Sequence, residues 1–320
     1  MAYKLEMDEL NKVLAGGIRE GESIHIFGPK QSGKSIFSYQ LSIELMRKSR
    51  GNVLFIDTEK SFLRGFHQYW TEVFKRRFNL DFDVLEVNVE RYAPVKGKRG
   101  RREKMEVLRV FESVLMDLGI KYSIDALERA VDLFLTGFEL KANNADKAVY
   151  VLEISNAVKL LALLGVEGTL EGSGKQVFKV NNLIDPEFSS LAGFIKERGI
   201  KIVVLDSFGM LIKNTVSSDI ANLPTRANIS NQLLGRLLAI TTEIDLISMV
   251  TNHASQDPST KRLMFFGGSP VGYSFKYSFY MKRGKDQNSR ILVVYRSPHL
   301  PDKSVEIELK IGNDGFRLNR

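Results

Sequence analysis

Residues 23–35 read SIHIFGPKQSGKS, a short apolar run that leads into a glycine-rich turn. The turn from Gly28 to Ser35 fits the pattern G-x-x-x-x-G-K-[ST], and the amphipathic spacing of residues 36–48 predicts a helix after it. Glycines let several backbone N–H groups point at one phosphate, and the start of a helix adds its positive end. This stretch therefore predicts a strand, a phosphate-binding P-loop and a helix.

Each position of the P-loop has an expected partner in Mg·ATP. Lys34 should reach the β- and γ-phosphates, and the hydroxyl of Ser35 should be a ligand of Mg²⁺. The strand–loop–helix context argues against a chance match to the pattern. The predicted nucleotide-binding residues are Gly28, Pro29, Lys30, Gln31, Ser32, Gly33, Lys34, Ser35 and Ile36.

Two carboxylates follow predicted strands and are candidates for the chemistry of hydrolysis. Asp206 ends the apolar run of residues 202–205, as expected of a buried parallel strand, and would be the second protein ligand of Mg²⁺. Glu59, in the segment Asp57-Thr58-Glu59, would polarise the attacking water. The alternative is that Asp57 or Glu59 only caps a helix that begins near Phe62.

A histidine stands at the end of a further predicted strand. His253 follows Thr251-Asn252 and could contact the γ-phosphate and report its presence. A lone histidine is more often structural, so both interpretations stay open at this stage.

Composition limits the classes of function. The chain has 320 residues and a net charge of +8, which favours an anionic partner, nucleic acid first, over a merely lysine-rich surface. It has no cysteine, which excludes disulfides, thiolate zinc sites and a cysteine nucleophile. No apolar leader and no run of 18 apolar residues is present, so we expect a cytoplasmic protein without a membrane segment.

The alternation of strands and helices predicts an α/β fold with a mainly parallel central sheet. Residues 91–184 interrupt it with a basic loop and helical patterns at 103–118, 123–140 and 146–164. We therefore predict a core of residues 1–90 and 185–320 and a helical insertion at 91–184.

Separated motifs in this order resemble the RecA/RadA recombinase superfamily, especially archaeal RadA-like and RadB-like paralogues. The matching segments are 7–18 (MDELNKVLAGGI), 55–59 (FIDTE), 204–207 (VLDS), 250–252 (VTN) and the pair 267–268 (GG) and 297–301 (SPHLP). The resemblance covers residues 1–90 and 185–320. It implies a RecA-type ATPase core, a catalytic-base role for Glu59, and a function in DNA recombination or repair.

Three positions depart from the family pattern. His253 replaces the glutamine that links the γ-phosphate to the second DNA-binding loop. Phe66 stands opposite the arginine that packs near adenine and could stack on the base instead. Arg296 replaces the acidic residue that caps ATP across a filament interface, so a filament with nucleotide between protomers is not expected.

The resemblance also implies where single-stranded DNA would bind. The two matching loops are residues 207–226 and 254–267, in which cations lie beside Phe265 and Phe266. A further basic cluster lies at 91–104 and could hold phosphates without reading sequence. In each case the alternative is an ordinary solvated loop. The predicted DNA contacts are Lys96, Lys98, Arg99, Arg101, Arg102, Lys213, Arg226, Lys261 and Arg262.

Two rival functions remain open from the sequence. A KaiC-like signalling or scaffold ATPase would use the insertion to bind a protein partner, which could also be a recombinase. A hexameric motor would need an arginine supplied by a neighbouring subunit, for which the candidates are Arg283, Arg290 and Arg296.

Overall fold

The computed structural model describes residues 2–91, 109, 112–113, 115–116, 123, 127, 136–140, 147–256 and 263–319. The chain divides into two compact units, Met1–Glu86 with Ala142–Arg320, and Val87–Lys141. The larger unit therefore resumes near residue 142, whereas the sequence predicted that the core resumes at 185.

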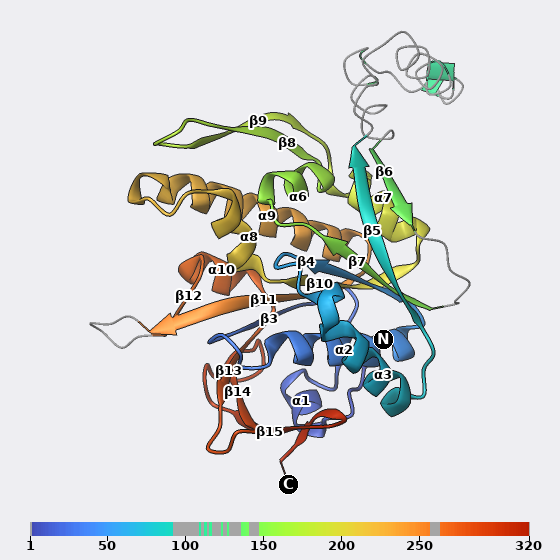
Figure 1. The fold of residues 1–320 in the computed structure, drawn as a ribbon, viewed down its shortest axis with the longest axis vertical. Helices are drawn as coiled ribbons and strands as arrows, with labels where there is room; N and C mark the ends of the chain where they lie inside the picture. The colour runs from blue at the N-terminus through green and yellow to red at the C-terminus, as the bar shows by residue number, and fades with distance from the viewer. Residues whose placement is uncertain are drawn as a thin grey trace. The chain divides into compact units, whose positions relative to one another are not determined.

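A long, mainly parallel sheet forms the centre of the larger unit (Figure 1). Its strands are β3 (Ser23–Gly28), β4 (Asn52–Asp57), β5 (Asp83–Arg91), β7 (Ala148–Glu153), β10 (Ile200–Asp206), β11 (Ile247–Gln256), β13 (Tyr277–Arg283), β14 (Ser289–Arg296), β15 (Glu306–Gly312) and β16 (Gly315–Leu318). They run in the order β16-β15-β14-β13-β3-β11-β10-β4-β7-β5. The strands from β13 to β7 pair in parallel, and β14, β15 and β16 are added antiparallel.

Helices cover both faces of this sheet, as the alternating pattern predicted (Figure 1). One face carries α1 (Asp8–Val13), α2 (Lys34–Ser49) and α3 (His67–Phe78). The other carries α6 (Ala157–Leu163), α7 (Ser190–Glu197), α8 (Phe208–Thr215), α9 (Leu223–Glu243) and α10 (Gly268–Ser274). No helix of the described ranges is both long and apolar enough to cross a membrane.

Smaller elements complete the described chain. The short strands β1 (Ala2–Tyr3) and β2 (Ile18–Arg19) pair with each other, β8 (Val166–Glu171) and β9 (Val177–Leu183) form a hairpin, and β12 (Leu263–Phe265) pairs with β11. In the smaller unit, β6 (Thr136–Leu140) pairs antiparallel with residues 87–91 of β5.

Two of the predicted helices are wrong in part. The pattern at 146–164 begins as strand β7, which lies between β4 and β5, and only its end forms α6. The pattern at 123–140 ends as strand β6. A short apolar run such as residues 148–152 is buried whether it is a helix or a strand, so its periodicity does not distinguish them. The predicted helix at 103–118 lies largely outside the described residues.

The register of the central strands brings their carboxyl ends to one level. Gly28 of β3 is paired with His253 of β11, and Asp57 of β4 is paired with Asp206 of β10. Because these strands are parallel, the loops that follow them emerge at the same edge of the sheet, where ligands bind in open α/β folds. The P-loop motif, both carboxylate motifs and His253 therefore lie at that edge.

A buried glutamine fastens the last strand to the helix that follows the P-loop. Gln40 of α2 donates through Nε2 to the carbonyl of Phe316 at 3.0 Å and accepts from its N–H at 2.7 Å. Both side chains are fully buried. Gln40 thus joins positions 276 residues apart.

Replacement of Gln40 by alanine should lower the free energy of unfolding by about 1–3 kcal/mol, because the buried N–H of Phe316 loses its acceptor. Urea denaturation measures the loss. The exposed Gln68→Ala in α3 is the matched control and should change stability by less than about 0.5 kcal/mol. Equal losses in the two variants would contradict the role of Gln40.

Candidate nucleotide-binding site

The P-loop connects β3 to α2, and two of its glycines are required by their surroundings. A Cβ atom at Gly28 would lie 2.1 Å from the carbonyl oxygen of Met281. Gly33 has a φ of 99°, in the left-handed region, and a Cβ there would lie 2.8 Å from the ring of Phe316. Gly33 is also the residue immediately before α2, so the loop curls directly into the helix start.

Lys34 is buried at the base of the loop. Its Nζ donates to the carbonyls of Gly28 at 3.1 Å and Pro29 at 2.8 Å, and lies 3.4 Å from Ser32 Oγ. Burial lowers the pKa of Lys34 to about 8, although the carboxylates of Asp206 and Glu59 oppose the shift. The lysine is thus held folded against its own loop, with its charge only partly compensated.

Asp206 faces the start of α2 from the end of β10. Its carboxylate accepts hydrogen bonds from the hydroxyls of Ser35 and Thr251. Burial raises the pKa of Asp206, and the nearby Glu59 adds to this, while both hydrogen bonds and Lys34 act in the opposite direction. A buried carboxylate of this kind is stabilised by an added cation.

Asp57 and Glu59, at and just after the end of β4, have different structural roles. Asp57 accepts from the backbone N–H of Glu59 at 3.0 Å and of Phe62 at 2.7 Å. It therefore holds the turn into the π-helical segment Phe62–Phe66, as the capping alternative predicted for one of these residues. Glu59 contributes only its backbone N–H to this turn, and it lines the cavity.

Glu59 is held from both sides by polar groups. Ser207 Oγ donates to Glu59 Oε1 at 3.0 Å, and His253 Nε2 lies 3.3 Å from the same oxygen. The hydrogen bond from His253 is the main cause that holds the pKa of Glu59 below its usual value. The peptide bond between Asp206 and Ser207 is cis. Through these contacts of Glu59, the ends of β4, β10 and β11 meet in the structure, although they lie far apart in the sequence.

These groups line one cavity of about 380 Å³, a size suited to a small ligand. Its wall includes Lys30, Gln31, Gly33, Lys34, Ser35, Ile36, Glu59, Ser61, Asp206, Ser207, His253, Arg290 and Ile311. Most of the residues predicted from the P-loop pattern are in this set. Gly28 and Pro29 serve the site through their carbonyls, which hold Lys34.

Two arginines contact the P-loop of their own chain, which the sequence did not predict. Arg290 Nε donates to the Ser32 carbonyl at 2.9 Å, and Arg283 Nη2 donates to Gln31 Oε1 at 3.2 Å. Burial, with Arg283 nearby, lowers the pKa of Arg290. Their candidacy as arginines supplied to a neighbouring subunit is thereby weakened, since they are engaged within the chain.

The oxygen donors of the cavity fit Mg²⁺. The Ser35 hydroxyl and the Asp206 carboxylate are hydrogen-bonded to each other, and hard oxygen ligands are those that Mg²⁺ prefers. Within the described ranges, no group of three or more His, Cys, Asp or Glu side chains could hold a metal alone. The chain thus offers few ligands, as in sites where substrate phosphates complete the coordination.

Several predicted residues are not part of this cavity. The predicted DNA contacts at 96–102 and 261–262 lie outside the described residues, as does the side chain of Phe66. Lys213 belongs to helix α8, not to a loop, and lies 5.6 Å from the ring centroid of Phe266. Arg226 belongs to α9 and donates to the carbonyl of Val216 at 3.2 Å, so it is not a free surface cation.

Replacement of Lys34 by methionine tests the burial of its charge. Because folding lowers the pKa of Lys34 from 10.5 to about 8, the unfolded chain binds more protons between these values. The free energy of unfolding of the nucleotide-free protein should therefore rise with pH through this window by a term that Lys34→Met lacks. Urea denaturation below, within and above the window measures the difference. Parallel pH profiles of the two proteins would contradict it.

Comparison with known proteins agrees with the fold and with the resemblance of the motifs. Residues 181–317 match the Rad51 family model, whereas no curated protein matches the chain. A solved structure described as "Crystal structure of the RadB recombinase" matches with a TM-score of 0.50 and 14% sequence identity, over 98% of each chain. At this identity the structural match establishes the fold, which is the predicted RecA-type α/β fold. Residues 181–317 are thus similar to the Rad51 family, and the chain has the fold of the RadB recombinase structure.

Proposed function

We propose that the chain is a Mg²⁺-dependent ATPase that binds DNA, preferably single-stranded, and assists homologous recombination or DNA repair. The observation that carries the proposal is the convergence of Lys34, Ser35, Asp206 and Glu59 on one cavity at the carboxyl edge of the sheet. The match of residues 181–317 to the Rad51 family model and the RecA-type fold support it.

In this proposal the P-loop binds the triphosphate through its backbone N–H groups and Lys34. Phosphate oxygens would replace the carbonyls of Gly28 and Pro29 as partners of Lys34, and their charge would favour its protonated form. Ser35 and Asp206 would hold Mg²⁺, which when bound supplies positive charge beside the β- and γ-phosphates.

Glu59 would orient the attacking water. As the oxygen of water forms its bond to the γ-phosphorus, the bond to the β–γ bridging oxygen breaks, and the proton of the water passes to Glu59. The products are ADP and inorganic phosphate. The hydrogen bond from His253, which lowers the pKa of Glu59, favours the ionised carboxylate, the form that can accept a proton.

Strand β11 connects the nucleotide site with the proposed DNA-binding surface around Phe266. His253 contacts Glu59 on one side, and its carbonyl accepts from the N–H of Phe266 at 3.2 Å on the other. Asn252 Nδ2 also donates to the carbonyl of Phe266 at 2.9 Å. A change in the contacts of Glu59 on hydrolysis would therefore reach the segment that holds Phe266, which is the coupling we propose.

Glu59→Gln should bind Mg·ATP with nearly the affinity of the wild type but lose turnover by at least about a hundredfold, because the amide cannot accept the proton. Lys34→Ala should lose both binding and turnover. Equilibrium binding of a fluorescent ATP analogue and release of phosphate measure the two effects. The exposed Glu72→Gln in α3 is the matched control and should behave as the wild type. Normal turnover in Glu59→Gln would exclude Glu59 as the base.

Single-stranded DNA should stimulate hydrolysis, and the stimulation should fall steeply as salt rises, because phosphate contacts release counterions. Replacing the cations Lys96, Lys98, Arg99, Arg101 and Arg102 by glutamine should flatten that salt dependence. An ATPase assay with and without oligonucleotide over a range of salt concentrations measures both. Hydrolysis that ignores DNA but responds to a protein partner would favour a scaffold ATPase instead.

A further inference from the structure

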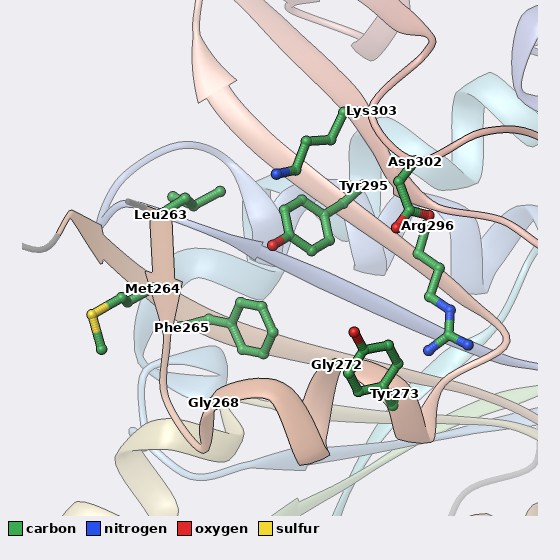
Figure 2. A pocket seen from close by; sticks show the side chains of 10 residues that line it. All are labelled: Leu263, Met264, Phe265, Gly268, Gly272, Tyr273, Tyr295, Arg296, Asp302 and Lys303. Carbon is green, nitrogen blue, oxygen red and sulfur yellow. The ribbon is translucent and has the colours of Figure 1, made fainter. Parts of the chain in front are cut away.

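A second cavity of about 480 Å³ lies at the other end of β14, away from the P-loop. Figure 2 shows its side chains, which come from β12, from α10, from the end of β14 and from the turn before β15. The residues that carry the argument are Phe265, Tyr273, Tyr295, Arg296, Asp302 and Lys303. No step of the hydrolysis proposed within one chain uses this cavity. Arg296 was a candidate only for a site shared with a neighbouring subunit.

Aromatic rings and cations alternate around this second cavity (Figure 2). The guanidinium carbon of Arg296 lies 4.7 Å from the ring centroid of Tyr273, and Lys303 Nζ lies 4.8 Å from that of Tyr295. Among the described lining residues, two cations outnumber one carboxylate, that of Asp302. Tyr273 is 71% exposed, so most of its ring is accessible to a ligand.

Arg296 has a donor that the described chain does not satisfy. Its Nη1 atom is buried and has no hydrogen-bond partner within the described residues. An unpaired buried donor is costly, and a guanidinium recognises phosphate oxygens through paired N–H groups. No ion pair among the described residues offsets the charge of Arg296, so an anionic group in this second cavity would pair with its guanidinium.

The wall beside these cations consists of packed aromatic rings. Phe265 packs against Tyr295 at a centroid distance of 6.1 Å and against Phe27 of β3 at 4.8 Å. Gly272 lets it approach α10, since a Cβ there would lie 2.6 Å from the ring of Phe265. A flat ring entering the cavity would thus meet fixed aromatic surfaces at low entropic cost.

We propose that the second cavity binds one nucleotide unit of a single-stranded nucleic acid. The base would stack on Tyr273 or Tyr295, and the flanking phosphate would lie against Arg296 and Lys303. The inference rests on the proposed DNA-binding function. It extends the predicted surface from the end of the second loop, which holds Phe265, to Tyr273, Tyr295, Arg296 and Lys303. The cavity adjoins β11, the strand that would respond to the nucleotide, because β12 pairs with β11. The N–H of Phe266 also donates a hydrogen bond to the carbonyl of His253.

Fluorescence anisotropy of a labelled oligothymidine, without ATP, tests the proposal. Tyr273→Ala and Arg296→Gln should each weaken binding about tenfold, the size expected for one lost stack or charged contact. Arg296→Gln should also reduce the slope of affinity against salt by about one counterion. The matched controls are Tyr69→Ala and Arg76→Gln, exposed residues of α3, which should stay within about twofold of the wild type. Pocket variants that bind as tightly as the controls would overturn the proposal.

Photocross-linking identifies where the oligonucleotide binds without relying on a measurement of affinity. An oligonucleotide carrying 5-iododeoxyuridine should form adducts on Tyr273 or Tyr295, identified by mass spectrometry of the wild type. Adducts found only elsewhere would overturn the proposal, as would displacement of the oligonucleotide by equally low concentrations of free thymidine monophosphate. Wild-type protein that hydrolyses ATP but binds no oligonucleotide would refute the DNA function itself. Oligonucleotide affinity that is unchanged in Tyr273→Ala and Arg296→Gln would refute only this site.

Discussion

The parallel register of β3, β11, β10 and β4 is the constraint on which the site depends. Pairing Gly28 with His253 and Asp57 with Asp206 brings four loops to one edge of the sheet. A shift of register by one residue would turn each side chain to the opposite face. The apolar cores of these strands, which are buried on both faces, fix the register and thereby the chemistry of the strand ends.

That edge holds charges that the protein alone balances poorly. Burial makes Lys34 easier to deprotonate and Asp206 harder to ionise, because each is removed from water without a full counter-charge. A triphosphate with its cation would supply the missing charges of both signs. Binding should therefore relieve a cost that the folded chain carries.

Local motifs made the P-loop, the strand that ends at Asp206 and the pairing of Glu59 with that site predictable from sequence. The strand β7 was not predictable in the same way, because a buried parallel strand and a buried helix both read as apolar runs. The sequence offered Arg290 only as an arginine supplied to a neighbouring subunit. Its contact with the P-loop of its own chain was not predictable, since its partner Ser32 lies 258 residues away. The sequence also did not show that Asp57 holds the turn whereas Glu59 lines the cavity. These roles depend on the directions of the two side chains, which spacing does not give.

Strand β14 bears one arginine in each of the two cavities. Arg290 holds the P-loop carbonyl of Ser32 near one end, and Arg296 closes the strand at the other. An extended strand rises about 3.3 Å per residue, so the backbone positions of Arg290 and Arg296 lie about 20 Å apart along β14. Sliding or tilting of β14 would thus move both cavities together, and a force applied at either one would be transmitted mechanically to the other.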